Sequence, residues 1–300
     1  MKKISILIFL IFNLFSFSQE QKTDSIVDGW QKSGKTSFLI NQTAFSNWVS
    51  GGENSIAGTL SVDYNLNYAK NGWSWDTKMI GSFGVNKNSD SRFFKKIDDR
   101  IEINSVVAKK FIEKFSFSSF LNFKTQFAKG FKYSNNEDGY EIRTELTRIF
   151  SPAYIQLGVG MYWKESNSLW VNFAPVTGRL ILASKKFTND LNEGEEYFGI
   201  TQGQNSRFEL GASVSAFYKF ELVENIILEQ SVNLYSDYLY KADNIDVDYT
   251  LSAFMRINDY LSTTLVIQCL YDDNAIKRVQ LREVFGLAFI MDITEIPKII

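Results

Sequence analysis

The residues of this chain that could do chemistry are mainly carboxylates and lysines, because the sequence contains no histidine and one cysteine, Cys269. Without histidine, sites that pair it with a serine or cysteine nucleophile are excluded, as are zinc sites with histidine ligands. A single cysteine also excludes an intrachain disulfide and a cysteine zinc cluster. We therefore expect no enzyme activity and no bound cofactor.

Many of the charged residues lie at alternate positions in long runs whose other positions are apolar. In residues 55–68, an apolar set alternates with polar residues that include Asp63; the apolar set is Ile56, Gly58, Leu60, Val62, Tyr64, Leu66 and Tyr68. A period of two indicates a strand, because successive side chains of a strand point to opposite faces. This run exceeds the usual strand of about 5–6 residues. It suffices to cross a bilayer, which takes roughly 9–11 tilted residues.

Similar runs recur along the chain and predict an all-β fold, a transmembrane antiparallel up-and-down β-barrel of about twelve strands. Ten or fourteen strands remain alternatives, because residues 139–149 could extend existing strands or form a separate hairpin. Asn71-Gly72 predicts a tight turn, and Pro175 predicts a bulge. The twelve predicted strands are 36–48, 54–69, 73–86, 97–110, 114–128, 153–164, 169–183, 207–221, 225–240, 245–257, 261–271 and 277–292.

The connections and the start of the chain support a membrane barrel over a soluble β-sandwich or lipocalin-like barrel. Every second connection is short, as the periplasmic turns of bacterial barrels are, while most of the others are longer. Residues 1–18 have the basic start and apolar stretch of a signal peptide. We expect 19–35 to be a short periplasmic segment and 36–300 to be the barrel, in the outer membrane of a Gram-negative bacterium and in contact with its lipid.

The polar strand faces supply a set of charged residues that we predict to face the lumen. A barrel of twelve strands has a backbone diameter of roughly 24 Å, so side chains leave a bore on the order of 10 Å or close it. These residues are compatible with two interiors: a plugged, ion-paired one and a narrow hydrated channel. The predicted lumen set is Asp63, Asp76, Lys78, Glu102, Lys124, Glu209, Lys219, Glu229, Asp246, Asp248 and Arg256.

A short motif lies after the first predicted strand. Residues 41–55, which read NQTAFSNWVSGGENS, together with Trp30 and Gly34, resemble the Bacteroidota family known as domain of unknown function 3078. The resemblance, over nearly the whole mature chain, implies an outer-membrane barrel and no known activity. The motif either fixes the register of the first two strands or contacts a partner at the mouth. Its candidate residues are Trp30, Asn47, Trp48, Gly51, Gly52, Glu53 and Asn54.

Two functions follow as hypotheses from these features. The first is a narrow channel for small solutes. The alternative is a structural or accessory barrel that binds a lipoprotein, secretion component or surface polymer through its loops. The net charge of −2 gives no argument for nucleic acid. Acidic groups at 98–99, 243–248 and 272–273 have no calcium-loop spacing, so we expect solvated loop charge there.

Overall fold

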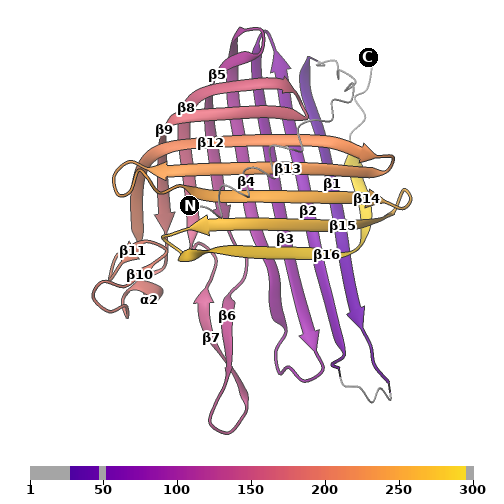
Figure 1. The fold of residues 1–300 in the computed structure, drawn as a ribbon, viewed down its shortest axis with the longest axis vertical. Helices are drawn as coiled ribbons and strands as arrows, with labels where there is room; N and C mark the ends of the chain where they lie inside the picture. Colours follow the sequence, from indigo (N-terminus) through magenta and orange to yellow (C-terminus); the bar gives the residue numbers. More distant parts are fainter. Residues whose placement is uncertain (1–27, 47–51, 295–300) are drawn as a thin grey trace.

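The dominant feature of the computed structural model, which describes residues 28–46 and 52–294, is one antiparallel sheet of twelve strands that closes into a barrel (Figure 1). Wall strands that follow one another in the chain are neighbours in the sheet, and β16 returns to β1. The predicted fold class and strand count are therefore confirmed. The wall strands are β1 Gly29–Thr43, β2 Ser55–Lys70, β3 Trp73–Asn88, β4 Lys95–Ile112, β5 Phe115–Thr125, β8 Ala153–Ser166, β9 Leu169–Leu182, β12 Ser206–Val223, β13 Ile226–Asp237, β14 Asp246–Arg256, β15 Leu261–Asp272 and β16 Ile276–Thr294.

The first strand differs from its expected bounds at both ends. β1 begins at Gly29, where it pairs with Ala69 of β2, so residues 29–35 belong to the wall and not to a periplasmic segment. It ends at Thr43 instead of Trp48, and Trp48 lies outside the described residues. Backbone pairing with β2 extends the strand, because alternate residues of the pair satisfy their amides and carbonyls in the ladder.

The alternation of side chains holds around the wall and separates an apolar outside from a polar inside. Leu60, Phe117 and Phe208 are exposed on the outer face. Inward positions such as Thr59 and Asn122 are buried and polar. A soluble barrel would place its apolar faces in the opposite direction. The fold thus presents an apolar belt around a polar lumen, which is the arrangement of transmembrane barrels.

The two ends of the barrel differ in their connections. At one end the strands are joined by short turns, and the β2–β3 turn uses Asn71 and Gly72 with φ of 52° and 74°, as the predicted tight turn requires. At the other end most connections are longer, and two carry structure of their own. We call this the loop-bearing end.

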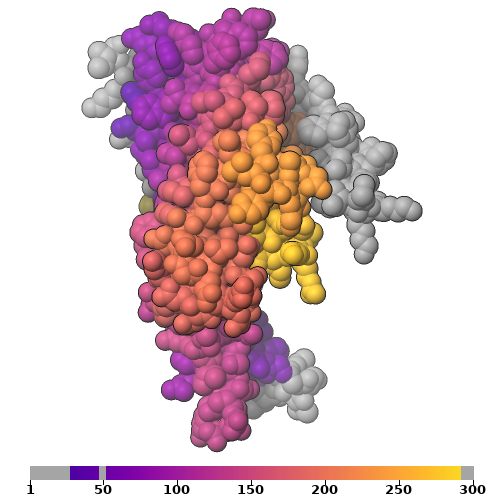
Figure 2. All heavy atoms as spheres, turned by 90° about the vertical axis from the view of Figure 1, so that its left-hand side faces the viewer, coloured from indigo at the N-terminus to yellow at the C-terminus, as the bar shows by residue number. Residues whose placement is uncertain are grey.

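The segment around residue 139 forms a separate hairpin, which settles the strand count at twelve. The hairpin consists of β6 Gly130–Asn135 and β7 Glu141–Thr147 and forms its own two-stranded sheet. It projects beyond the wall (Figure 2). The next long connection holds α2 Lys185–Thr188, β10 Glu196–Tyr197 and β11 Ile200–Thr201. No helix in the described part of the chain is long and apolar enough for a membrane span.

The predicted bulge is present in β9. Ala174 and Thr177 are both buried on the inner face, while Pro175 and Val176 are exposed between them. The ladder with β12 shifts register between Gly211 and Ser213 at this point. Proline lacks the amide that a ladder needs, so the strand accommodates it by an extra residue. Every position after the bulge therefore faces the opposite side from that expected of strict alternation.

Candidate functional site

The lumen is crossed by an ion pair between strands that are far apart in the wall. Lys124 on β5 and Asp248 on β14 lie 2.8 Å apart, Nζ to Oδ2. Four strands, β8, β9, β12 and β13, separate β5 from β14 along the shorter path of the sheet. The side chains therefore meet across the bore and do not run along the wall.

Neighbouring groups hold this pair in place. Glu102, the register partner of Lys124 on β4, lies 3.9 Å from its Nζ and forms an ion pair with Arg100. Gln268 on β15 donates a hydrogen bond of 2.8 Å to the second carboxylate oxygen of Asp248. Buried charges need such partners, because an unpaired one carries the full desolvation penalty. The network joins β4, β5, β14 and β15 through side chains alone.

Further contacts cross the lumen at other places. Lys164 of β8 reaches Asp76 of β3 at 2.9 Å, and Arg282 of β16 reaches Asp98 of β4 at 2.7 Å. The ammonium group of Lys78 on β3 lies 6.0 Å from the ring centre of Phe217 on β12. None of these strand pairs is adjacent in the sheet. The interior of the barrel is therefore bridged from several sides.

The other predicted lumen residues take different positions. Lys219 and Glu229 form a 3.1 Å ion pair between adjacent strands, which does not cross the lumen. Asp63 faces inward opposite Lys35 of β1. Arg256 is exposed at the short-turn end and pairs with Asp259 of the β14–β15 turn. Arg256 therefore belongs to the rim and not to the interior.

Near the loop-bearing end, a second charged group surrounds Glu209 on β12. This carboxylate is fully buried, with 0% exposure. It lies 2.5 Å from Nε of Arg179 and 2.9 Å from Nε of Arg207, and it accepts a 3.1 Å hydrogen bond from Asn274. Arg179 also pairs with Asp246 of β14 at 2.7 Å. One carboxylate and two guanidinium groups thus tie β9 and β12 to β14 and the β15–β16 turn.

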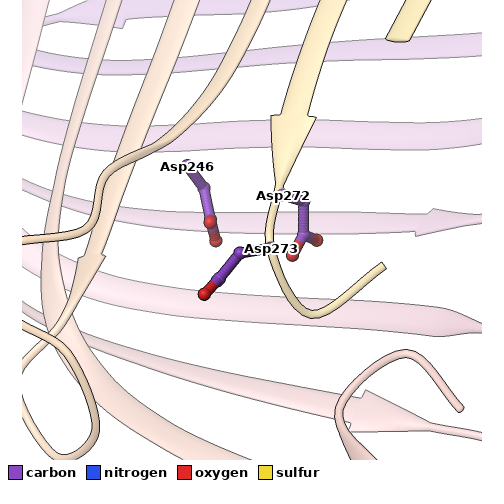
Figure 3. A group of neighbouring side chains, drawn as sticks. All are labelled: Asp246, Asp272 and Asp273. Carbon is purple, nitrogen blue, oxygen red and sulfur yellow. The ribbon is translucent and has the colours of Figure 1, made fainter. Parts of the chain in front are cut away.

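Three carboxylates gather beside this group: Asp246 at the start of β14, Asp272 at the end of β15, and Asp273 in the turn that follows (Figure 3). One oxygen atom from each lies within 4.8 Å of the others. Asp272 is 8% exposed, so the expectation of solvated loop charge was wrong for this residue. Asp246 pairs with Arg179, and Asp273 pairs with Lys241 at 3.2 Å. The cluster is thus partly neutralised by its own cations.

A pocket of about 530 Å³ opens at the same end. It is formed by the segment between β9 and β12, the β13–β14 loop and the β15–β16 turn. Above it, the guanidinium group of Arg207 lies 4.3 Å from the ring centre of Tyr240. Its lining residues are Arg179, Gly194, Glu196, Arg207, Asp237, Tyr240, Lys241, Asn244, Asp246, Asp273, Asn274, Ala275, Ile276 and Lys277.

Ion pairs fix the β6–β7 hairpin to the rest of the loop-bearing end. A hydrogen bond from Lys95 of β4, with further bonds from Arg92 and Ser91, lowers the pKa of Glu141 from 4.5 to about 2. Hydrogen bonds from Arg148 and then from Lys186 of α2 lower the pKa of Glu145 from 4.5 to about 2. The hairpin is thereby connected to the wall and to the neighbouring loop.

The motif residues that the structure describes hold the β1–β2 connection together. Gly52 has φ of +132°, and a Cβ there would lie 2.7 Å from Phe45. Asn54 accepts a hydrogen bond from the backbone amide of Phe45, and Glu53 accepts one of 3.2 Å from the side chain of Asn88. These contacts favour the alternative in which the motif fixes the register of the first two strands. Asn47, Trp48 and Gly51 lie outside the described residues.

Trp30 is separated from the rest of the motif by the length of β1. Its ring lies 5.1 Å from Tyr68 and 5.6 Å from Trp75, centre to centre. This aromatic group is at the short-turn end, next to the β2–β3 turn. Aromatic side chains form belts at the interfaces of membrane barrels, and Trp30 lies at the end of the wall opposite to Gly52.

The sequence reasoning missed the arginines of both charged groups. Arg100 lies two residues from Glu102, and Arg207 lies two residues from Glu209. Alternate residues of a strand share a face, so the sequence already indicated that each arginine lies beside its glutamate. Arg179 gave no such signal. Counted from the inward Asn172, strict alternation would place Arg179 on the lipid face, and only the bulge at Pro175 turns it inward.

Comparison with known proteins finds one matching family model and several solved barrels of low sequence identity. A family model described as "Protein of unknown function (DUF3078)" matches residues 40–131, not the nearly complete chain that we expected. The match includes most of the motif that carried the resemblance. No curated protein matches the sequence significantly.

Several solved structures are similar in fold. The translocator domain of autotransporter NalP from Neisseria meningitidis is 8% identical with a TM-score of 0.41, covering 96% of this chain and 94% of that one. An outer membrane channel from Pseudomonas putida F1 is 9% identical with a TM-score of 0.37, covering 92% and 99%. These TM-scores are low, so the fold class rests on the closed sheet itself.

Proposed function

We propose that this protein is an outer-membrane β-barrel of a Gram-negative member of the Bacteroidota, exported by the signal peptide of residues 1–18. Its apolar outer face and its ends of unequal connection length support this location. We further propose that it acts through its loop-bearing end as an accessory barrel. Its partner would be a lipoprotein, a secretion component or a surface polymer.

The observation that carries the accessory role is the Lys124–Asp248 ion pair across the lumen. A passive channel needs a continuous hydrated path, and this pair crosses that path. Separating the two groups would take the cation away from Asp248 and leave Lys124 with the more distant carboxylate of Glu102, which is costly. The resting barrel is therefore closed, and function falls to the surface that the loops present.

A narrow channel for small solutes is the second candidate. The lumen is lined by charges of both signs, which a hydrated path would need. In that case the ion pair acts as a gate, and a ligand or membrane potential must separate Lys124 from Asp248.

We also propose that the protein is not an enzyme. The chain contains no histidine, the residue on which general acid–base and nucleophilic sites most often depend. Lipase or protease activity in a purified sample would contradict this.

Bilayer recordings and partner capture test the proposal together. The purified wild-type barrel should give no conductance steps, and a mild-detergent pull-down should recover a stoichiometric partner. The Lys124→Ala/Asp248→Ala variant should open more often than the Lys219→Ala/Glu229→Ala control, which removes a pair between adjacent strands. Discrete, salt-dependent openings of the wild type would instead favour the channel.

A further inference from the structure

The pocket at the loop-bearing end is built as a binding site for a polar ligand. Its volume of about 530 Å³ falls within the roughly 300–1,000 Å³ typical of small-molecule sites. It lies above the ion pairs that close the lumen, and three separate connections of the chain contribute to it. A ligand there would contact the barrel from outside without passing through it.

The charges that line the pocket balance one another. The cations Arg179, Arg207, Lys241 and Lys277 face the anions Glu196, Asp237, Asp246 and Asp273. Most are already paired within the protein: Arg179 with Asp246 at 2.7 Å, Lys241 with Asp273 at 3.2 Å, and Arg207 with Asp237 at 3.7 Å. A charged ligand at one of these paired groups would compete with its partner inside the protein, whereas a neutral ligand need not.

The pocket also offers an aromatic surface. Tyr240 is 68% exposed, although its ring already contacts the guanidinium group of Arg207. Aromatic faces pack well against flat apolar groups. The lining of the same pocket also includes planar amides and carboxylates, among them Asn244, Asn274 and Asp273. These side chains supply several donors and acceptors at short spacing.

A hexose unit matches both properties, because its C–H face is apolar and its rim carries hydroxyl groups that donate and accept hydrogen bonds. We propose that the pocket at the loop-bearing end binds a neutral sugar chain. One hexose would pack against Tyr240, and its hydroxyl groups would form hydrogen bonds with the amides and carboxylates of the lining. This inference rests on the proposed accessory role and specifies that the surface polymer is a neutral polysaccharide.

Calorimetric titration of the full-length barrel in detergent tests the proposal. The probes are maltohexaose, cellohexaose and mannohexaose, with dextran sulfate and Ca²⁺ as charged comparisons. We expect saturable binding of at least one neutral hexasaccharide. Tyr240→Ala should weaken it about threefold to tenfold, the range of one aromatic contact. Asn244→Ala should weaken it in the same direction.

Tyr140→Ala is the matched control, because Tyr140 is 64% exposed on the hairpin connection at the same end and does not line the pocket. It should leave binding unchanged. The proposal is overturned if no neutral hexasaccharide binds up to its solubility limit, if only a charged probe binds, or if Tyr240→Ala binds as tightly as wild type. If no neutral sugar binds, but the wild type gives no conductance steps and recovers a partner, only the sugar ligand is rejected and the accessory role stands. Wild-type conductance would instead overturn the accessory role.

Discussion

At the scale of single residues, Glu209 is a buried charge that needs partners inside the protein. It is fully buried and has two guanidinium groups and one amide as partners. Replacing a buried ion pair by apolar groups is often harmless, but removing one partner alone leaves the other charges unpaired. The two arginines share this carboxylate, and each has a further acidic partner in Asp246 or Asp237.

Glu209→Gln should lower the free energy of unfolding by about 3–5 kcal/mol, because Arg179 and Arg207 lose their common counter-charge in a buried site. Urea unfolding in detergent, followed by gel mobility of folded and unfolded barrel, measures this. Glu221→Gln, on the exposed end of the same strand, should change stability by no more than about 0.5 kcal/mol. Equal midpoints for the two variants would show that the buried carboxylate has no special role.

At the scale of elements, the β6–β7 hairpin is an addition to the barrel, held by the charges of Glu141 and Glu145 on β7. Glu141 reaches Lys95 of the wall at 2.6 Å, and Glu145 reaches Lys186 of α2 at 2.7 Å. The pKa of each glutamate is lowered to about 2. A lowered folded-state pKa means that the anchoring is complete above the ordinary value and is lost as the pH falls through the lowered one.

A dye on Asp138→Cys, at the hairpin tip in a Cys269→Ala background, should report this loss. Its fluorescence anisotropy should stay constant from neutral pH to about the ordinary glutamate value of 4.5 and fall as the pH approaches 2. The Glu141→Gln/Glu145→Gln variant should show the lower anisotropy at every pH. A fall that is complete above pH 4.5 would mean that other groups hold the hairpin.

At the scale of the whole molecule, the barrel has an apolar exterior and a charged, bridged interior. Cys269 tests the exterior, because it is the only cysteine in the sequence. It pairs in register with Tyr249 and Leu281, both on outward positions. Cys269 therefore faces outward from the barrel, and the membrane around it remains a prediction.

A spin label on Cys269 in reconstituted vesicles should be several-fold more accessible to oxygen than to a water-soluble nickel chelate, because oxygen concentrates in lipid. The label on Asp138→Cys in the Cys269→Ala background should show the reverse order, since the hairpin tip projects beyond the wall. Greater access of the nickel chelate to Cys269 would place this face in water and contradict the membrane assignment.

The elements that could be predicted are those with a strong local signal. Alternation over residues 55–68 gave the second strand to within a residue or two, Asn71-Gly72 gave its turn, and Pro175 gave a bulge. The start of β1 was missed, because residues 29–35 lack a clean apolar alternation and join the wall through pairing with β2. The candidate site was only partly foreseeable, since Arg179 is turned inward by the bulge.

The sequence by itself determined which side chains share a face along most strands, and that no histidine chemistry is available, because these depend on periodicity and composition along the chain. The tertiary structure decided what meets across the lumen. Lys124 and Asp248 are remote in sequence, and their contact depends on how the sheet closes and staggers, which no local pattern encodes. Closure brings opposite walls within reach of one another, and there the paired charges bridge the lumen.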